Sequence, residues 1–372
     1  MRTYLLWLVG IATLTSLVTA PISRPALAET GEWRELTTNG APDAPSARFS
    51  TVVWDGQANR LLVFGGYDGA NYLDDLWEYT SRGWSPVPGS INRPPKRFAA
   101  AAVWDSQANR LLLFGGSSGS YVRNDLWQYT ARSGWQQLTG NGALTTPAPR
   151  HFAAAHWDSQ ANRLLVFGGY SYGGSTCPQS VTRTCEPSPR PEQYSVEGFH
   201  NDLWEYTDAG GWRLLSPDGT SNAPQPRSAH IAEWDTQANR LLVFGGTAGT
   251  TPLGDLWQYT SAEGWQLLAN QDTAVSPAPR AYHAATWDNQ GNRLLVFGGS
   301  NARGEYYNDT WSYSTAAGWR PVDSTEPGNV PAARHEVEAA WDSQANRMLI
   351  FGGWDGTHYR NDLWQYRLSG DR

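Results

Sequence analysis

Six arginines and six aspartates recur at matching places along the chain, and together they could recognise an anionic group. The arginines are Arg48, Arg97, Arg150, Arg227, Arg280 and Arg334, and the aspartates are Asp75, Asp125, Asp202, Asp255, Asp309 and Asp362. A guanidinium carries five N–H donors in a planar fork, which suits carboxylates, sulfates and acidic peptides. It pairs equally well with an aspartate of its own chain. Two interpretations follow: an arginine-lined mouth that binds a ligand, or an Arg–Asp ladder that joins loops.

Histidines and glutamates form a second set of reactive side chains, located in the segments that follow these arginines. They are His151, His156, His230, Glu233, His283, His335, Glu336 and Glu338. Imidazole and carboxylate groups can bind metals or transfer protons. Their spacing matches no metal-binding motif, and a single histidine in a strand is more often a hydrogen-bonded wall residue. We therefore expect no metal and no cofactor, and we assign no catalytic residue.

A repeated segment must position all of these side chains. Its fullest copy runs from Trp104-Asp105 to Gly115-Gly116, and the other copies begin at Trp54, Trp157, Trp234, Trp287 and Trp341. The second glycines of the copies are Gly66, Gly116, Gly169, Gly246, Gly299 and Gly353. They are separated by 50, 53, 77, 53 and 54 residues. A fixed period of this size determines the architecture and is considered before any local pattern.

The pattern within each unit predicts four short strands. The first runs from the arginine to Trp-Asp, the second is Leu-Leu-Val-Phe, the third is Asp-Leu-Trp-x-Tyr and the fourth is Gly-Trp-x-x-Leu. The turn Asp-x-Gln-Ala-Asn-Arg joins the first two strands, because Asp and Asn bond their own backbone and accept left-handed conformations. The double glycine then ends the second strand where a side chain would be excluded. We expect the tryptophans to fill the spaces between sheets.

A double glycine closing an apolar strand, a downstream Trp/Tyr pair and a later Gly-Trp resemble kelch repeats. The resemblance covers nearly the whole chain after its first 28 residues. It implies an all-β, six-bladed kelch-type β-propeller with four antiparallel strands per blade. It also implies that partners bind at the end of the propeller where the first strands begin.

The two ends of the chain predict how the ring closes. The last unit stops after Asp362–Tyr366 without a Gly-Trp, and the missing element stands near the N-terminus as Gly31-Glu32-Trp33. We expect residues 32–37 to form the outer strand of the last blade, which leaves only protected edges. The first unit is one residue shorter than the others between Arg48 and Trp54, which predicts a local irregularity.

The N-terminal segment has the features of a secretory signal peptide. Arg2 precedes an apolar stretch from Leu5 to Ala20, and Ala26-Leu27-Ala28 provides a cleavage site. We expect cleavage after Ala28, a single propeller over residues 29–372, and a secreted, periplasmic or extracellular protein without membrane insertion. A retained anchor is the alternative, although threonine and serine interrupt the apolar stretch.

Charge and cysteine content narrow the choice of partners. The net charge is −7, and loss of Arg2 and Arg24 with the signal peptide makes it (28 − 2) − 35 = −9. Such an acidic protein is a poor candidate for binding nucleic acid.

Cys177 and Cys185 both lie in the long interval, within an insertion spanning Tyr170 to Phe199. In an oxidising compartment we expect one local disulfide between them. The insertion itself is either a decorative loop or a lid.

Aromatic residues in the loops after the double glycines depart from the repeat. Loops on a rigid scaffold commonly carry binding residues. The candidate ligand-binding residues are therefore these aromatics, the arginines that begin the first strands and two adjacent histidines. They are Arg97, Arg150, Arg227, Arg280, Arg334, His151, His335, Tyr72, Tyr121, Tyr307, Trp354 and Tyr359.

Two classes of function remain open. We favour an exported, monomeric, non-catalytic binding module that takes a protein, a carbohydrate or an anionic small molecule at this face. The alternative is an exported kelch enzyme similar to the periplasmic sugar-acid epimerases and mutarotases or, less favoured, to copper oxidases of the galactose oxidase type. The oxidase resemblance implies a cysteine cross-linked to a tyrosine, whereas Cys177 and Cys185 are expected to pair with each other. Architecture alone does not imply chemistry.

Overall fold

The computed structural model describes residues 29–89, 92–143, 145–172, 198–270, 275–326 and 328–369. The expected signal peptide and the cysteine pair Cys177 and Cys185 lie outside these residues. Across the described ranges the regular secondary structure is entirely β. Within those ranges, no helix has the length and apolar character needed to cross a membrane.

Each repeat supplies strands of four kinds, as its pattern predicts. The innermost strands are β2 (Phe49–Asp55), β6 (Ala101–Asp105), β10 (Ala154–Asp158), β16 (Ile231–Asp235), β22 (Ala284–Asp288) and β26 (Glu338–Asp342). The second strands are β3 (Arg60–Tyr67), β7 (Arg110–Phe114), β11 (Arg163–Phe167), β17 (Arg240–Phe244), β23 (Arg293–Phe297) and β27 (Arg347–Phe351). The third strands are β4 (Tyr72–Thr80), β8 (Leu126–Thr130), β14 (Leu203–Thr207), β20 (Leu256–Thr260), β24 (Thr310–Ser314) and β28 (Leu363–Leu368). The outer strands are β5 (Gly83–Pro86), β9 (Gly134–Thr139), β15 (Gly211–Ser216), β21 (Gly264–Ala269), β25 (Gly318–Ser324) and β1 (Glu29–Thr37).

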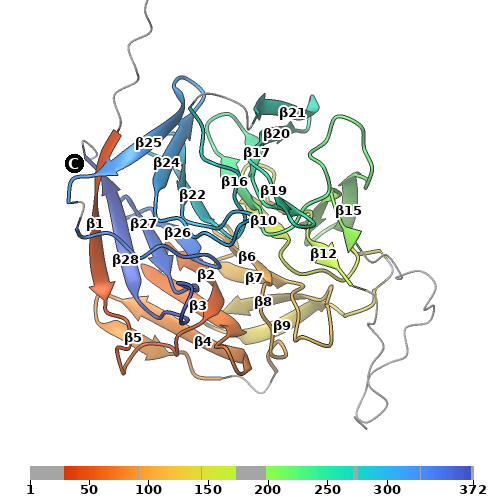
Figure 1. Cartoon of the computed structure of the whole chain (residues 1–372). Helices are drawn as coiled ribbons and strands as arrows, with labels where there is room; N and C mark the ends of the chain where they lie inside the picture. Colours follow the sequence, from red (N-terminus) through yellow and green to blue (C-terminus); the bar gives the residue numbers. More distant parts are fainter. Residues whose placement is uncertain are drawn as a thin grey trace, which may run out of the picture.

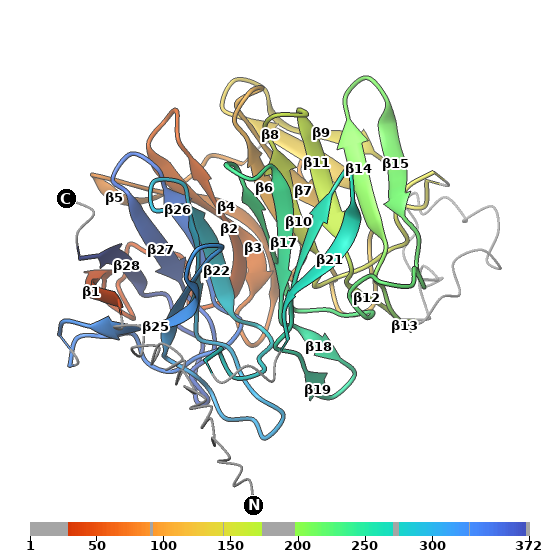
Figure 2. The ribbon, with the colours of Figure 1, turned by 90° about the horizontal axis from the view of Figure 1, so that it is seen from above.

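The strands form four separate four-stranded sheets and one eight-stranded sheet, arranged as a β-propeller. Figure 1 views the propeller along the axis of its ring, and the strands around the centre are β2, β6, β10, β16, β22 and β26. Two short ladders lie outside these sheets: β12 (Tyr170–Ser171) pairs with β13 (Gly198–Phe199), and β18 (Thr247–Ala248) pairs with β19 (Thr251–Pro252). In Figure 2 both ladders lie toward one end of the ring, the end with the loops that follow the double glycines. We name this end the loop face.

A repeated backbone hydrogen bond joins each unit to the next and closes the ring. The N–H of the second glycine donates to the carbonyl oxygen of the next unit's arginine. The pairs are Gly66–Arg97, Gly116–Arg150, Gly169–Arg227, Gly246–Arg280, Gly299–Arg334 and Gly353–Arg48, with lengths of 2.8 to 3.1 Å. The last pair returns to the first unit. At Gly115 (φ +66°) a Cβ would stand 2.7 Å from the carbonyl oxygen of Arg150, so this close approach requires glycine.

The N-terminal strand closes the ring as its sequence predicts. β1 pairs antiparallel with β28, with Trp33 opposite Tyr366 and Glu35 opposite Trp364. Its first residues also pair in parallel with β25, where Gly31 lies opposite Ser324. This parallel pairing was not predicted. It merges the two groups of strands on either side of β1 into the eight-stranded sheet.

Neighbouring units pack through a repeated aromatic contact. The phenylalanine before each double glycine meets the tryptophan of the next unit's outer strand, with ring centroids 4.7 to 5.1 Å apart. The pairs are Phe64–Trp135, Phe114–Trp212, Phe167–Trp265, Phe244–Trp319, Phe297–Trp33 and Phe351–Trp84. Trp33 thus occupies the place of the tryptophan that the last unit lacks. The prediction that these tryptophans form the core is confirmed.

The innermost strands differ from the prediction at their first residues. In five units the strand begins four residues after the arginine, because the second residue after the arginine has a positive φ of 51° to 58°. These residues are Ala99, Phe152, Ala229, Tyr282 and Glu336. Their backbones form a chain of four hydrogen bonds of 2.9 to 3.1 Å, in which the N–H of each residue after Ala99 donates to the carbonyl oxygen of the equivalent residue in the preceding unit. The shorter first unit lacks this residue, and β2 instead extends to Phe49 through a register shift, which confirms the predicted irregularity.

Candidate functional site

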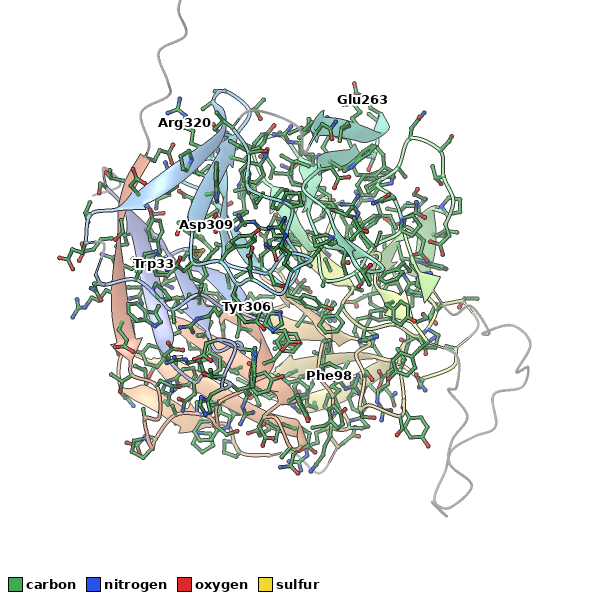
Figure 3. All side chains as sticks on the ribbon, viewed as in Figure 1. Trp33, Phe98, Glu263, Tyr306, Asp309 and Arg320 are labelled. Carbon is green, nitrogen blue, oxygen red and sulfur yellow. The ribbon has the colours of Figure 1, made fainter. Side chains whose placement is uncertain are left out.

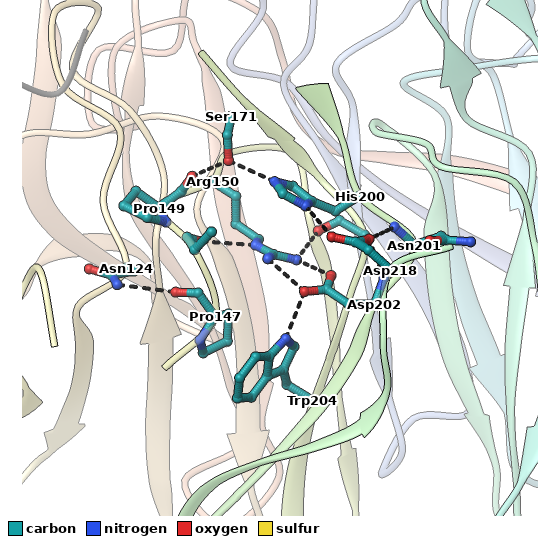
Figure 4. A network of polar contacts seen from close by, with 12 residues as sticks. Asn124, Pro147, Pro149, Arg150, Ser171, His200, Asn201, Asp202, Trp204 and Asp218 are labelled. Atoms are coloured by element: carbon teal, nitrogen blue, oxygen red, sulfur yellow. Dashed lines mark hydrogen bonds and ion pairs between the residues drawn. The ribbon is translucent and has the colours of Figure 1, made fainter. Parts of the chain in front are cut away.

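The repeated arginines are the centres of buried polar clusters. Each Nε donates to a backbone carbonyl two residues earlier, and one Nη donates to the carbonyl of the first glycine of its unit. Both Nη groups also bind the repeated aspartate, as between Arg97 and Asp125 at 2.7 and 2.9 Å. The indole N–H of Trp127 completes this cluster by donating to Asp125 at 2.7 Å. Figure 4 shows the equivalent cluster of Arg150, Asp202 and Trp204.

This geometry favours the Arg–Asp ladder over the arginine-lined mouth. All six arginines are at most 2% exposed. The five that were candidate ligand-binding residues, Arg97, Arg150, Arg227, Arg280 and Arg334, are each in an ion pair with an aspartate of the same unit. A ligand could bind these guanidiniums only by displacing that aspartate. Their geometry therefore does not support a role as ligand contacts.

Aromatic side chains on the loop face form a connected set, which we name the aromatic network. One branch runs from Tyr72 through Phe98, Phe152 and Tyr282 to His335, with ring centroids 5.2 to 5.7 Å apart. The remaining members are Phe49, Tyr67, His151, Tyr170, Tyr172, Phe199, Tyr306, Trp354 and Tyr359. All are half-buried except Phe49, which is buried. In Figure 3, Phe98 and Tyr306 lie toward the middle of the ring, whereas Glu263 lies at its periphery.

The structure thus brings together five of the predicted site residues. Tyr72, His151, His335, Trp354 and Tyr359 all belong to the aromatic network. Burial lowers the pKa of His151 and His335 to about 4, so both rings are neutral at pH 7. Of the other two predicted aromatics, Tyr307 packs over the guanidinium of Arg280 at 4.5 Å and so covers an ion pair. Tyr121 is half-buried and makes no ring contact among the described residues.

Sequence reasoning missed the central members of the network. Phe49 and Phe98 directly follow a repeated arginine, and Phe152 and Tyr282 stand two residues after one. The other units have serine, alanine or histidine at the first position and serine, alanine or glutamate at the second. A phenylalanine or tyrosine at these positions is therefore the signal that could have identified them. The positive φ of Phe152 and Tyr282 is unusual for bulky residues and could not be read from the sequence.

A cavity of about 140 Å³ lies inside the ring of innermost strands. Phe49, Phe152 and Tyr282 line its loop-face end, and alanines make up much of the remaining wall. Its acidic groups are Glu233, Glu336 and Glu338, and no lysine or arginine stands among its lining residues in the described ranges. His156 adjoins it, with Nδ1 at 3.5 Å from Glu233 Oε2. The histidines and glutamates singled out in the innermost strands therefore lie in and beside one cavity.

Comparison with known proteins agrees with this geometry. Residues 192–372 match the family described as the KLHDC2/KLHL20/DRC7 Kelch-repeats domain. Kelch domain-containing protein 1 of Mus musculus is 28% identical over 59% of this chain and 51% of its own length. Kelch repeat-containing protein 2 of Saccharomyces cerevisiae is 30% identical over 51% of this chain and 23% of its own length. The chain belongs to the kelch-repeat β-propeller family.

The kelch repeats account for only part of each relative. A leucine-zipper-like transcriptional regulator 1 homolog from Drosophila melanogaster is 29% identical over 49% of this chain but only 18% of its own length. The chain therefore spans about half or less of the length of these three relatives.

The kelch propeller also contains a Ser–His–Asp arrangement that the sequence did not reveal. Ser171 Oγ lies 2.8 Å from His200 Nε2, and His200 Nδ1 lies 2.8 Å from Asp218 Oδ2 (Figure 4). Ser171 is the second residue of the long insertion, and His200 directly follows its end. Nucleophilic catalysis uses such an order of groups, with serine activated by the imidazole.

The hydrogen bonds and burial of this group oppose a nucleophilic role. The hydroxyl of Ser171 donates to the backbone carbonyl of Pro149, so its proton is directed toward that oxygen. A neutral imidazole has one N–H, so His200 can donate to only one of its two neighbours, Ser171 and Asp218. Asp218 Oδ1 meanwhile accepts the backbone N–H groups of Asn201 and Asp202. With Ser171 only 6% exposed, we interpret the group as a structural clamp at the base of the insertion.

Titration of the cavity predicts a stability maximum near pH 6.5. Burial raises the pKa of Glu233 and Glu338 from 4.5 to about 8, and the charge of Glu338 adds to the shift of Glu233. Above pH 4.5 these folded-state acids hold protons that the unfolded chain has lost, so the free energy of unfolding falls as pH rises toward 8. Burial lowers the pKa of His151, His156 and His335 from 6.5 to about 4 and that of His230 to about 3, and it holds that of His283 well below 6.5. These five histidines outnumber the three acids whose pKa is raised, Glu233, Glu336 and Glu338, so stability also falls as pH drops below 6.5.

A double variant isolates the alkaline side of this profile. We expect wild-type protein to lose on the order of 1–2 kcal/mol between pH 6.5 and 8.5, after allowance for water in the cavity. Glu233→Gln with Glu338→Gln should flatten this decline and steepen the fall on the acid side, because the two acids no longer oppose the histidines between pH 4.5 and 6.5. Urea unfolding at half-unit pH steps measures both sides. An unchanged alkaline slope in the double variant would show that these two carboxyl groups do not cause it.

Proposed function

We propose that this protein is an exported, non-catalytic binding module whose propeller presents the loop face to a protein partner. The aromatic network carries the proposal. It is half-buried and continuous across several units, and it is built largely from residues that depart from the repeat. Rigid aromatic side chains provide large contact area at small entropic cost, and they dominate the binding energy of protein interfaces.

The ion-paired arginines favour recognition by aromatic contact over recognition of an anion. An anionic ligand would have to compete with six intramolecular carboxylates that already bind their arginines in bidentate fashion. The neutral histidines of the network likewise add no positive charge at pH 7. Binding of a carbohydrate that stacks on the aromatic rings would change the proposed ligand from a protein to a carbohydrate.

The proposed molecule is a six-bladed ring formed by residues 29–372. Six glycine-to-arginine hydrogen bonds that return to the first unit support this count. So do the six Phe–Trp contacts between successive units. Export is proposed from the signal-peptide features of residues 1–28.

Matched variants test the proposed face. The mature protein would be cross-linked to its surroundings in the exported fraction of its host, and the captured proteins would be quantified. Tyr72→Ala with Trp354→Ala should reduce capture of a specific partner at least tenfold, which corresponds to about 1.4 kcal/mol. The control is Leu267→Ala, which removes an apolar side chain that is 48% exposed on an outer strand.

Binding by purified components would complete the test. The identified partner should bind the wild-type protein and the Leu267→Ala variant equally, and all variants should unfold at similar temperatures. Equal binding by the Tyr72→Ala/Trp354→Ala variant would exclude the aromatic network as the partner site. Selective binding of glycans in place of protein would assign the face to carbohydrate.

A further inference from the structure

The central cavity has walls that suit a positively charged organic group. At its loop-face end the ring of Phe49 stacks on that of Phe152, with centroids 5.7 Å apart and 9° between the planes. Phe152 in turn meets Tyr282 edge-on at 5.2 Å. The faces of aromatic rings attract ammonium and guanidinium groups. Carboxyl groups in the same cavity can supply charge-assisted hydrogen bonds to such a group.

The carboxyl groups of the cavity have few partners within the protein. Glu336 accepts a hydrogen bond from the hydroxyl of Tyr359 at 3.3 Å. Glu233 accepts one from the backbone N–H of Trp287 at 3.1 Å and adjoins the neutral ring of His156. For Glu338, burial alone accounts for its raised pKa, and no hydrogen bond to its side chain is found in the described part of the chain. All three acids therefore lack a cationic partner.

The positively charged side chains of the protein do not neutralise these three acids. Each of the six repeated arginines binds an aspartate, and none of them lines the cavity. Burial lowers the pKa of the lining residue His230 to about 3 and holds that of His283 well below its ordinary value. Neither ring carries a charge near neutral pH. The cavity is thus complementary to a cation that the protein itself does not provide.

We propose that the central cavity binds an organic cation, an ammonium or guanidinium group on an alkyl chain, with Glu336 and Glu338 as its counter-charges. Glu233 lies in the same cavity, and Phe152 and Tyr282 contact the alkyl chain. The cation could be a free amine or the Lys or Arg side chain of a partner, since the recognised chemistry is the same. The inference depends on the cavity and requires no protein partner.

Binding should be linked to proton release. Glu233 and Glu338 titrate near pH 8 and Glu336 near pH 7, so a cation that binds their ionised forms must displace protons. The other titratable groups that face them are His151, His156, His230, His283, His335, Tyr282 and Tyr359. The pKa values of these histidines are lowered, and those of the two tyrosines are raised from 10, so none of them titrates between pH 6 and 8.5. Affinity should therefore increase with pH across this range.

A charged probe and its neutral analogue test the inference directly. Titration calorimetry on the mature protein would use n-butylguanidinium and n-butylurea, which share shape and differ in charge. We expect butylguanidinium to bind about tenfold more tightly at pH 8.5 than at pH 6 and to release protons, detected in two buffers of different ionisation enthalpy. Butylurea should bind at least tenfold more weakly at pH 8.5.

Three single variants decide whether the cavity acids are responsible. Glu336→Gln and Glu338→Gln should each weaken butylguanidinium binding about tenfold at pH 8.5. Glu305→Gln is the control, because it removes the same charge from an exposed loop residue that does not line the cavity. Equal affinity for butylurea, or unchanged affinity in both cavity variants, would overturn the proposal. Displacement of the probe by micromolar Ca²⁺ or Zn²⁺ would also overturn it by assigning the cavity to a metal.

A separate measurement distinguishes a free amine from a partner's side chain as the source of the cation. The peptide acetyl-Gly-Arg-Gly-amide should bind more tightly than butylguanidinium if a partner's side chain is the natural ligand, and no more tightly if a free amine is. The Tyr72→Ala/Trp354→Ala variant should bind butylguanidinium like the wild-type protein, since neither residue lines the cavity. Loss of partner capture with retained probe binding would thus separate the proposed function from this inference.

Discussion

Replacing Arg97 with alanine should destabilise the protein by about 3–5 kcal/mol, the usual cost of leaving a buried charge without its partner. Asp125, which Arg97 binds, is only 2% exposed, so water cannot solvate the carboxylate that remains. The variant also removes the donor to the carbonyl of Gly115. Equilibrium unfolding in urea would measure the loss as a reduced transition midpoint.

The repeat provides a matched control for this prediction. Arg280 makes the same hydrogen bonds and is equally buried, with the ring of Tyr307 packed over it, but the side chain of its partner Asp309 is 41% exposed. Water can hydrate Asp309 when the guanidinium is removed, so Arg280→Ala should cost clearly less than Arg97→Ala. The double variant Arg97→Ala/Asp125→Ala should recover part of the single-variant loss because no uncompensated charge remains. Equal losses in the two single variants would contradict the assigned role of aspartate burial.

The same variants separate scaffold from ligand contact. If the arginines only hold loops in place, the folded fraction of Arg280→Ala should bind a partner as tightly as the wild-type protein does. A loss of affinity for the partner without a loss of stability would indicate that these arginines contact the partner. The ion pairs make the first outcome the expected one.

Trp33→Ala should be the other large perturbation, at about 3–5 kcal/mol. Trp33 is 2% exposed and packs between Phe297 and Tyr366, with ring centroids at 4.9 Å from each. It is therefore the aromatic contact on which ring closure depends. Thermal unfolding would measure the loss, and limited proteolysis should cut the N-terminal strand of the variant sooner.

Trp84→Ala serves as the comparison for ring closure. Trp84 makes the equivalent contact with Phe351 at 5.1 Å but is half-buried, and its strand does not join two units. We expect a smaller loss of stability and no added protease sensitivity near residue 33. If Trp33→Ala unfolds at the wild-type temperature, β1 does not hold the ring together.

Much of the fold could be predicted because each unit encodes its strands locally. The apolar run, the Asp/Asn turn and the double glycine each act within a few residues, and six copies make the pattern unambiguous. Pairing of the N-terminal strand with β28 was also predictable, because the last unit lacks one element and the chain start provides it.

The candidate site was less predictable because its residues meet across units. The arginines and aspartates could be recognised as a set, but whether each guanidinium faced a ligand or its own aspartate depended on burial. The sequence alone determined the repeat, its strands and the way its ends complement each other, since these are local or periodic properties. Only the tertiary structure decided which side chains enclose the central cavity and the aromatic network. Those contacts join residues of separate units, and their geometry follows from how the closed ring packs.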